Sequence, residues 1–148
     1  NKLSLEDDLV NLAIINIDKL FSKLSDKKLT LIKQKDELAT YCSKINKEDS
    51  FINFNMRSIE IYNIFKAFIE WPLTKFIHNN IEIIIRDMYV SDGISNAKPG
   101  TILDFSKDGL SIKTIDSAIV ITHLQFPGKR TIGPKDVYNS YKSFFFNN

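Results

Sequence analysis

Cysteine and histidine are scarce in this sequence. Among its 148 residues there is one cysteine, Cys42, and there are two histidines, His78 and His123, far apart along the chain. A single cysteine cannot form an internal disulfide, and a zinc site would need three further ligands beside it. Uninterrupted apolar runs such as residues 118–121 are far shorter than the roughly 20 residues that cross a membrane. We therefore expect neither a metal site nor a membrane span.

Glycine and proline are also few, and neither sign of charge dominates. Five glycines, four prolines and 43% apolar residues exclude collagen-like, linker-like and disordered compositions, and the length suits about one folded domain. Twenty basic and 18 acidic residues give a net charge of +2. Residues 72–148 carry that excess, with nine basic and seven acidic groups, against 11 of each in residues 1–71. This weak bias permits a polyanionic partner without requiring one.

The first third of the chain carries one long helical pattern followed by a polar stretch. Apolar residues recur every three or four positions and predict a helix over residues 4–25, with Ser4 as its N-cap and Asp7 three residues on. The apolar stripe consists of Leu5, Leu9, Leu12, Ala13, Ile17, Leu20, Phe21 and Leu24. Residues 29–33 are predicted to form a short strand or an extended segment, and residues 34–55 a charged linker.

The remainder predicts a short helix, a run of strands and a final helix. Ser58 is expected to cap a helix that ends at Trp71, because the residue before a proline disfavours the helical conformation. Brief β-prone runs then alternate with turn signals, over residues 73–78, 81–90, 101–105, 110–115 and 118–126. Residues 133–136 begin a third short helix, with proline at an early position. This succession of short strands favours a small barrel.

Several segments share their order and spacing with one known enzyme family. Residues 40–49 (TYCSKINKED) and 52–54 (INF) resemble T-Y-A-x-K-I-S-K-E-[DE]-x-x-I-D-W, and residues 64–72 (IFKAFIEWP) resemble I-R-A-F-N-P-W-P. Residues 99–102 (PGTI) match P-G-T-I, residues 124–130 (LQFPGKR) match L-Q-x-x-G-K-[KR], and residues 135–140 resemble the family's terminal helix. From about residue 9 to 142, the chain resembles the bacterial methionyl-tRNA formyltransferases.

The resemblance implies the C-terminal portion of such an enzyme. It implies a remnant of the catalytic domain over residues 1–33, a linker over residues 34–55 and an OB-like C-terminal domain over residues 56–148. The expected fold class is therefore α+β, a small antiparallel OB-like β-barrel with short flanking helices, preceded by an N-terminal helix and an extended linker. Because the sequence begins with Asn1 and has no signal-peptide pattern, we also expect a fragment of a cytoplasmic protein.

The family's activity lies in a part of the enzyme that is not recognisable here. Its members transfer a formyl group from 10-formyltetrahydrofolate to the methionyl amino group of initiator tRNA. Their catalytic Asn, His and Asp lie on an H-x-S-L-L-P segment and a later Asp-x-Gly segment, and neither occurs in this sequence. We therefore assign no catalytic residue and no cofactor to this chain, and expect it to be inactive alone. The implied partners are initiator methionyl-tRNA and the missing N-terminal catalytic domain, with no membrane and a monomeric state.

The resemblance also implies which residues bind the tRNA. In the family, the linker and the C-terminal domain present positive potential to the RNA. Lys44 and Lys47 match basic linker positions, and Lys129 and Arg130 match the basic pair of a late loop. Such cations contact phosphate oxygens, which positions an RNA without reading its sequence. A solvated surface is the alternative role for all four residues.

Two other functions remain open at the level of the sequence. The chain could be the C-terminal module of a related enzyme that formylates a nucleotide sugar or hydrolyses formyl-folate, since those relatives share the barrel but need no tRNA surface. It could also be a free-standing OB-type binding protein.

Three aromatic or histidine features have a structural and a functional interpretation. Trp71 could stack on a base, but its place at a helix end favours packing in the core. His123 could contact a phosphate when protonated, although a structural role is favoured because imidazole is mostly neutral at pH 7. The aromatic tail at residues 144–146 is expected to dock on the barrel rather than to stay exposed.

Overall fold

The computed structural model describes residues 1–27, 29–93 and 95–146. These residues divide into two compact units, Asn1–Ile45 and Asn46–Asn148, which are described one at a time. The boundary between the units falls inside the segment that the sequence predicts as a linker.

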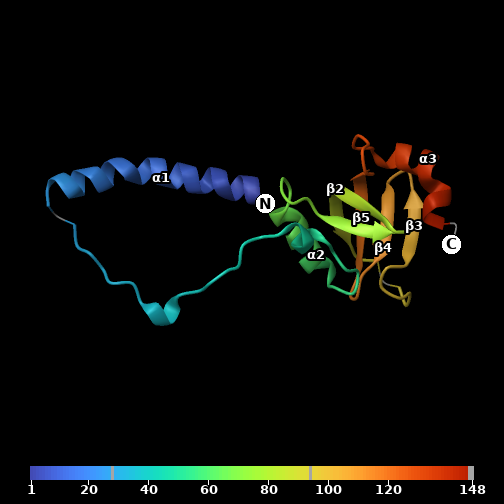
Figure 1. Cartoon of the computed structure of the whole chain (residues 1–148), viewed down its shortest axis with the longest axis horizontal. Coiled ribbons are helices and arrows are strands. Elements are labelled where there is room, and N and C mark those ends of the chain that lie inside the picture. Colours follow the sequence, from blue (N-terminus) through green and yellow to red (C-terminus); the bar gives the residue numbers. More distant parts are fainter. Residues whose placement is uncertain (28, 94, 147–148) are drawn as a thin grey trace. The chain divides into compact units, whose positions relative to one another are not determined.

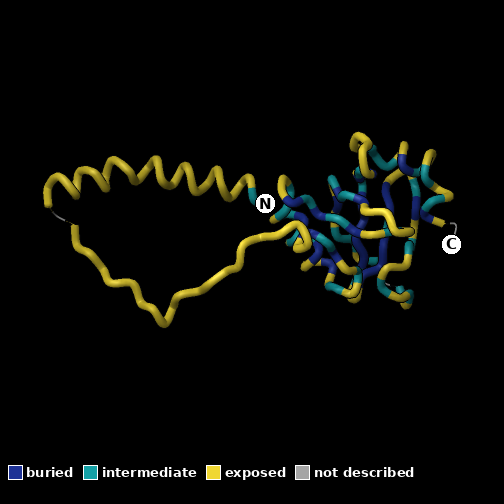
Figure 2. Tube along the Cα trace, viewed as in Figure 1, coloured by how far each residue is buried: buried dark blue, intermediate teal, exposed yellow. Residues whose placement is uncertain are grey.

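The first unit consists of a long helix and an irregular segment. Helix α1 (Lys2–Ser25) has no buried residue, and its apolar stripe is exposed along its whole length (Figure 2). The prediction of Ser4 as N-cap was wrong. Asn1 is the cap, because its Oδ1 accepts the backbone N–H of Ser4 at 3.1 Å, so the helix begins two residues earlier. Residues 29–33 form no strand, and a short 3₁₀ helix, η1 (Asp36–Leu38), follows them.

The second unit begins with a 3₁₀ helix, η2 (Lys47–Ser50), of which Ser50 is buried. The side chain of Asp49 accepts the backbone N–H of Asn46 at 2.8 Å, and the buried hydroxyl of Ser50 donates to the Lys47 carbonyl at 2.7 Å. Just after η2, Ile52 is buried. These contacts fix the backbone that carries Lys47.

Helix α2 (Ser58–Ala67) differs from its predicted form at both ends. Its N-cap is Arg57, and the backbone N–H of Ser58 instead donates to Oδ1 of Asp116 at 2.9 Å. The helix ends at Ala67, so the chain leaves it four residues before Trp71. Trp71 is therefore carried on a loop and is 52% exposed, which corrects the expectation of core packing. The helix buries one side against β2, with Ile61 fully inaccessible to solvent.

Five strands form one antiparallel sheet in the order β1-β2-β5-β4-β3 (Figure 1). The strands are β1 (Lys75–His78), β2 (Ile81–Ser91), β3 (Ile102–Ser106), β4 (Gly109–Lys113) and β5 (Ala118–Gln125). The α+β class and the antiparallel strands are confirmed. The sheet is open, because no ladder joins β1 to β3 in the described part of the chain, and these edge strands are the shortest together with β4. In the described residues, the strand pairing therefore does not close the sheet into the expected barrel.

The core lies between the sheet and the helices α2 and α3. Alternate residues of β2 and most of β5 are buried, including Ile83, Ile85 and Leu124. Helix α3 (Pro134–Phe146) packs against β3, β4 and β5, and its backbone is kinked at Tyr141. Phe145 is 4% exposed, so the expected docking of the aromatic tail is confirmed there.

Candidate nucleic-acid interface

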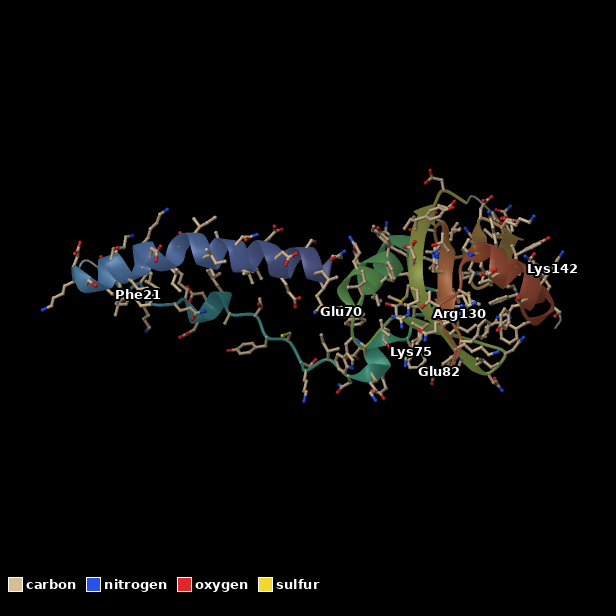
Figure 3. The ribbon with its side chains drawn as sticks, turned by 90° about the horizontal axis from the view of Figure 1, so that it is seen from above. Phe21, Glu70, Lys75, Glu82, Arg130 and Lys142 are labelled. Carbon is tan, nitrogen blue, oxygen red and sulfur yellow. The ribbon has the colours of Figure 1, made fainter. Side chains whose placement is uncertain are left out.

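The two late basic residues lie together on the turn between β5 and α3. Lys129 and Arg130 are both exposed (Figure 3 labels Arg130). The turn is closed by the backbone N–H of Lys129, which donates to the Phe126 carbonyl at 3.1 Å. Gly128 has a φ of 67°, a left-handed conformation that glycine adopts without steric cost. The Pro127-Gly128 pair thus projects two adjacent cations from the end of a buried strand.

The turn is anchored at both of its ends. On the entry side, Nε2 of Gln125 donates to the Lys129 carbonyl at 2.6 Å. On the exit side, Ile132 and Leu124 exchange both backbone hydrogen bonds, at 2.9 and 3.2 Å, as an isolated antiparallel bridge. The basic pair therefore belongs to a short loop that is fastened to β5 before α3 begins.

A cavity of about 340 Å³ lies between this turn and α3. It is lined by Lys129, Arg130, Ile132, Asp136, Ser140 and Tyr141. Its aromatic wall is fixed, because Tyr141 stacks on Phe126 with ring centroids 4.2 Å apart. Two cations and one carboxylate meet there, so the local charge is positive by one unit. Such a surface attracts phosphate groups.

The two linker lysines lie in different units. Lys44 belongs to the first unit and is exposed, but it is not without an interaction partner. Lys47 is exposed on η2 in the second unit. Within the described residues, the side chain of Lys47 has no recorded bond to the turn that carries Lys129 and Arg130. The structure thus brings Lys129 and Arg130 together on one turn.

The histidines occupy packing and surface positions. His78 lies against the rings of Phe144 and Phe145, with centroids 5.3 and 5.1 Å away. His123 is exposed, and its Nδ1 lies 3.7 Å from Oδ2 of Asp87, which also accepts the hydroxyl of Thr122 at 2.9 Å. In the described residues, neither imidazole has a hydrogen bond, ion pair or ring contact with the turn that carries Lys129 and Arg130. Elsewhere on the sheet, Lys75 pairs with Glu82 at 3.5 Å (Figure 3).

One carboxylate has a pKa set by the fold. The pKa of Asp116 is held below its usual 3.8, chiefly because the carboxylate accepts the backbone N–H of Ser58, with burial opposing and Thr114 and Arg57 adding to the effect. This group is the tie between α2 and the turn that joins β4 to β5.

Sequence reasoning missed the side chains that hold the basic turn. Gln125 belongs to the L-Q-x-x-G-K-[KR] match, but its contacts are not readable from that motif. Arg86 follows Ile84, the cross-strand partner of Gln125, by two residues and so shares a face of the sheet with Gln125. This partnership depends on the register of the two strands, which the sequence alone does not give.

Other kinds of site receive no support from the coordinates. Among residues 1–27, 29–93 and 95–146, no group of three or more His, Cys, Asp or Glu side chains could hold a metal ion. No helix in that same part of the chain is both long and apolar enough to traverse a bilayer.

Known proteins match this chain over most of its length. Residues 44–142 match the model of the formyl transferase C-terminal domain. Methionyl-tRNA formyltransferase from Legionella pneumophila subsp. pneumophila (strain Philadelphia 1) is 32% identical over 140 residues, which are 95% of this chain and 45% of that protein. The enzyme from Legionella pneumophila strain Corby is 31% identical with the same coverage. The chain thus spans less than half the length of these relatives.

Solved structures share the fold. A variant of HypX from Aquifex aeolicus superposes with a TM-score of 0.61 at 16% identity, covering 84% of this chain and 22% of that one. HypX in complex with tetrahydrofolic acid gives a TM-score of 0.59 at 17% identity, covering 88% and 23%. Since the family model matches well over half of the residues, the resemblance found in the sequence is confirmed: the chain belongs to the formyl transferase family and carries its C-terminal domain over residues 44–142.

Proposed function

We propose that this chain is the tRNA-binding portion of a methionyl-tRNA formyltransferase. The observation that carries the proposal is the fastened turn at Lys129 and Arg130, two exposed cations on a short loop of the family's C-terminal domain. In this role the domain binds initiator methionyl-tRNA by its phosphates, and Lys44 and Lys47 add to the same attraction from the segment that precedes α2.

The formyl transfer itself belongs to a separate catalytic domain in this proposal. That domain would use 10-formyltetrahydrofolate, and residues 1–33 would form its last part, followed by a linker that ends where the second unit begins at Asn46. The exposed stripe of α1 supports this division, because leucines such as Leu5 and Leu12 are more than half exposed in a helix with no buried residue. We further propose a monomeric protein located in the cytoplasm.

The expected contacts are electrostatic. Each phosphate that a lysine or arginine neutralises releases condensed counterions, so the binding constant falls as salt rises. Contacts of this kind do not depend on the RNA sequence, and the initiator tRNA would have to be recognised in the complete enzyme by other features.

A salt series of tRNA binding tests the proposal. The 148-residue chain should bind tRNA at low salt, and the plot of log K against log salt should have a negative slope. Replacing Lys129 and Arg130 together by Ala should reduce that slope by about 1.4 to 1.8, because each lost phosphate contact contributes about 0.7 to 0.9.

A matched variant separates this turn from net charge. Lys98 and Lys107 are also exposed cations of the second unit, away from the β5–α3 turn in sequence. Replacing both by Ala removes the same charge and should leave the slope close to that of the wild type. A wild-type chain that does not bind at low salt, or equal slopes for the two double variants, contradicts the proposal.

A further inference from the structure

The pairing of β2 with β5 places Arg86 beside the basic turn. Ile84 pairs with Gln125 and Met88 with Ile121, so the two irregularities at Asp87 cancel and the register is the same on both sides of them. Arg86 follows Ile84 by two residues and so lies on the same face of the sheet as Gln125. The half-buried Arg86 guanidinium thereby reaches the side chain of Gln125, at the end of β5.

Gln125 joins Arg86 to the turn through the two ends of one amide. Its Oε1 accepts two hydrogen bonds from Arg86, from Nε at 2.8 Å and from Nη2 at 2.5 Å. Its Nε2 donates to the Lys129 carbonyl at 2.6 Å. The charged donor fixes the orientation of the amide, because only the oxygen can accept from a guanidinium. The nitrogen must then point toward the turn.

The turn has few other restraints of its own. Residues 127–131 are all exposed, and a Cβ built on Gly128 would have no neighbour within 4 Å. Between Phe126 and the bridge at Ile132, the recorded hydrogen bonds of this described segment are the one that closes the turn and the one from Gln125. The Gln125 amide is therefore the side-chain restraint on the backbone of Lys129.

We propose that Gln125 is a positioning residue for RNA binding, which holds the Lys129-Arg130 turn in its binding geometry while Arg86 holds Gln125. The proposal rests on the proposed function of the turn. A pre-ordered turn presents its cations without first losing conformational freedom, and this loss otherwise subtracts from the affinity for phosphate. Gln125 need not touch the RNA, and it adds no charge.

The test uses two variants of the 148-residue chain. Gln125→Met keeps the length and neutrality of the side chain but removes both sets of hydrogen bonds. Gln125→Glu keeps the acceptor for Arg86 and loses the donor to Lys129. Thr122→Val is the matched control, because it removes from the same strand a hydroxyl that donates to Asp87 and lies 3.2 Å from Nδ1 of His123.

The first readout is the motion of the turn without any RNA. Backbone ¹⁵N order parameters of Lys129 and Arg130 should be near the rigid value of about 0.85 in the wild type and below about 0.6 in both Gln125 variants. Thr122→Val should leave them unchanged. An order parameter that stays high in both Gln125 variants overturns the proposal, as does a wild-type turn that is already mobile.

The second readout is the affinity for tRNA. Gln125→Met should weaken binding by about threefold to tenfold, as expected when a side chain or loop must be ordered on binding. Full affinity with a mobile turn overturns the positioning role. If the wild type does not bind tRNA at all, the proposed function fails, and the order parameters still decide whether Gln125 orders the turn. Should Gln125→Met not fold, Gln125→Glu supplies the order-parameter result, since it keeps the Arg86 pair.

Discussion

At the scale of single residues, the backbone at two glycines is decisive for the sheet and for the basic turn. Gly109, the first residue of β4, has a φ of 150°, and a Cβ there would lie 2.8 Å from the Ile121 carbonyl oxygen and from a Val120 methyl. Gly128 has a left-handed backbone too, but the space around it is open. An alanine at Gly109 would therefore add both steric contact and backbone strain, whereas an alanine at Gly128 would add backbone strain alone.

Gly109→Ala should destabilise the chain more than Gly128→Ala. The first substitution adds contact with the backbone of β5 to an unfavourable φ and should cost about 2 to 3 kcal/mol of unfolding free energy. The second adds only the left-handed conformation, which costs roughly 1 to 2 kcal/mol. Urea denaturation of the two variants checks the order. A Gly128→Ala variant that is the less stable of the two would contradict it.

The sequence predicts the position of the basic pair, Lys129 and Arg130, but it does not predict the side chains that hold their turn. Pro127 and Gly128 indicate a turn from sequence alone, so Lys129 and Arg130 could be placed on an exposed loop. The partnership of Arg86 with Gln125 could not be predicted, because it depends on the pairing register of two strands that are far apart in the sequence. Trp71 was misplaced for a related reason: the helix ends at Ala67, and a proline marks only the latest residue at which it could end.

At the scale of elements, α2 is fastened to the sheet by a charge at its N-terminus. Asp116 lies in the turn between β4 and β5 and accepts from the first backbone N–H of the helix, at 2.9 Å, as a capping side chain would. The carboxylate also accepts from the Thr114 hydroxyl at 3.2 Å and lies 3.4 Å from Nε of Arg57. One side chain thus joins the N-terminus of α2 to the turn between β4 and β5.

Asp116→Asn should lower stability in a pH-dependent way. The pKa of Asp116 is depressed in the folded state, so its contribution is present above its ordinary pKa of 3.8 and is lost as the pH falls through the lower folded value. Near pH 7 the variant should be about 0.3 to 1 kcal/mol less stable, because Asn can still accept from the Ser58 N–H but loses the negative charge that favours the helix N-terminus. Unfolding free energies measured from pH 7 downward should show the gap closing in acid.

Asp108→Asn is the control for this titration. Its carboxylate is exposed in the turn between β3 and β4 and makes no recorded hydrogen bond within the described residues. Its substitution should change stability little at any pH. A gap between wild type and Asp116→Asn that stays constant into acid would show that the cap does not depend on the charge.

The positions of strands were more predictable than their closure. The five observed strands lie within two residues of the predicted runs, because alternating apolar residues and turn dipeptides act locally. Whether β1 meets β3 depends on strands far apart in the chain, and their lengths of four and five residues offer few backbone groups for a ladder. The local pattern carries no information about that pairing.

At the scale of the whole molecule, the buried residues are confined to one unit. Every hydrophobic side chain in the core lies between Ile52 and Phe145, and the described residues of the first unit contribute none. We therefore expect the C-terminal domain to be stable without the first unit. Helix α1 exposes an apolar stripe that suits the surface of a further domain.

Removal of residues 1–45 should leave the domain folded. The chain that begins at Asn46 keeps the side chain of Asp49 on the Asn46 backbone and the whole core. Its thermal midpoint should agree with that of the 148-residue chain within about 2 °C, since a change of 1 kcal/mol would move it by roughly 4 to 8 °C. A larger loss would mean that the first 45 residues contribute to the domain's core.

The most direct measurement of the central claim is a titration of the ¹⁵N-labelled chain with initiator tRNA, followed by amide chemical shifts at low and at moderate salt. The largest changes should occur at Lys129, Arg130 and their neighbours in the turn between β5 and α3, and they should decrease as salt is added. Changes centred on the turn between β3 and β4, or no change at low salt, would contradict the account.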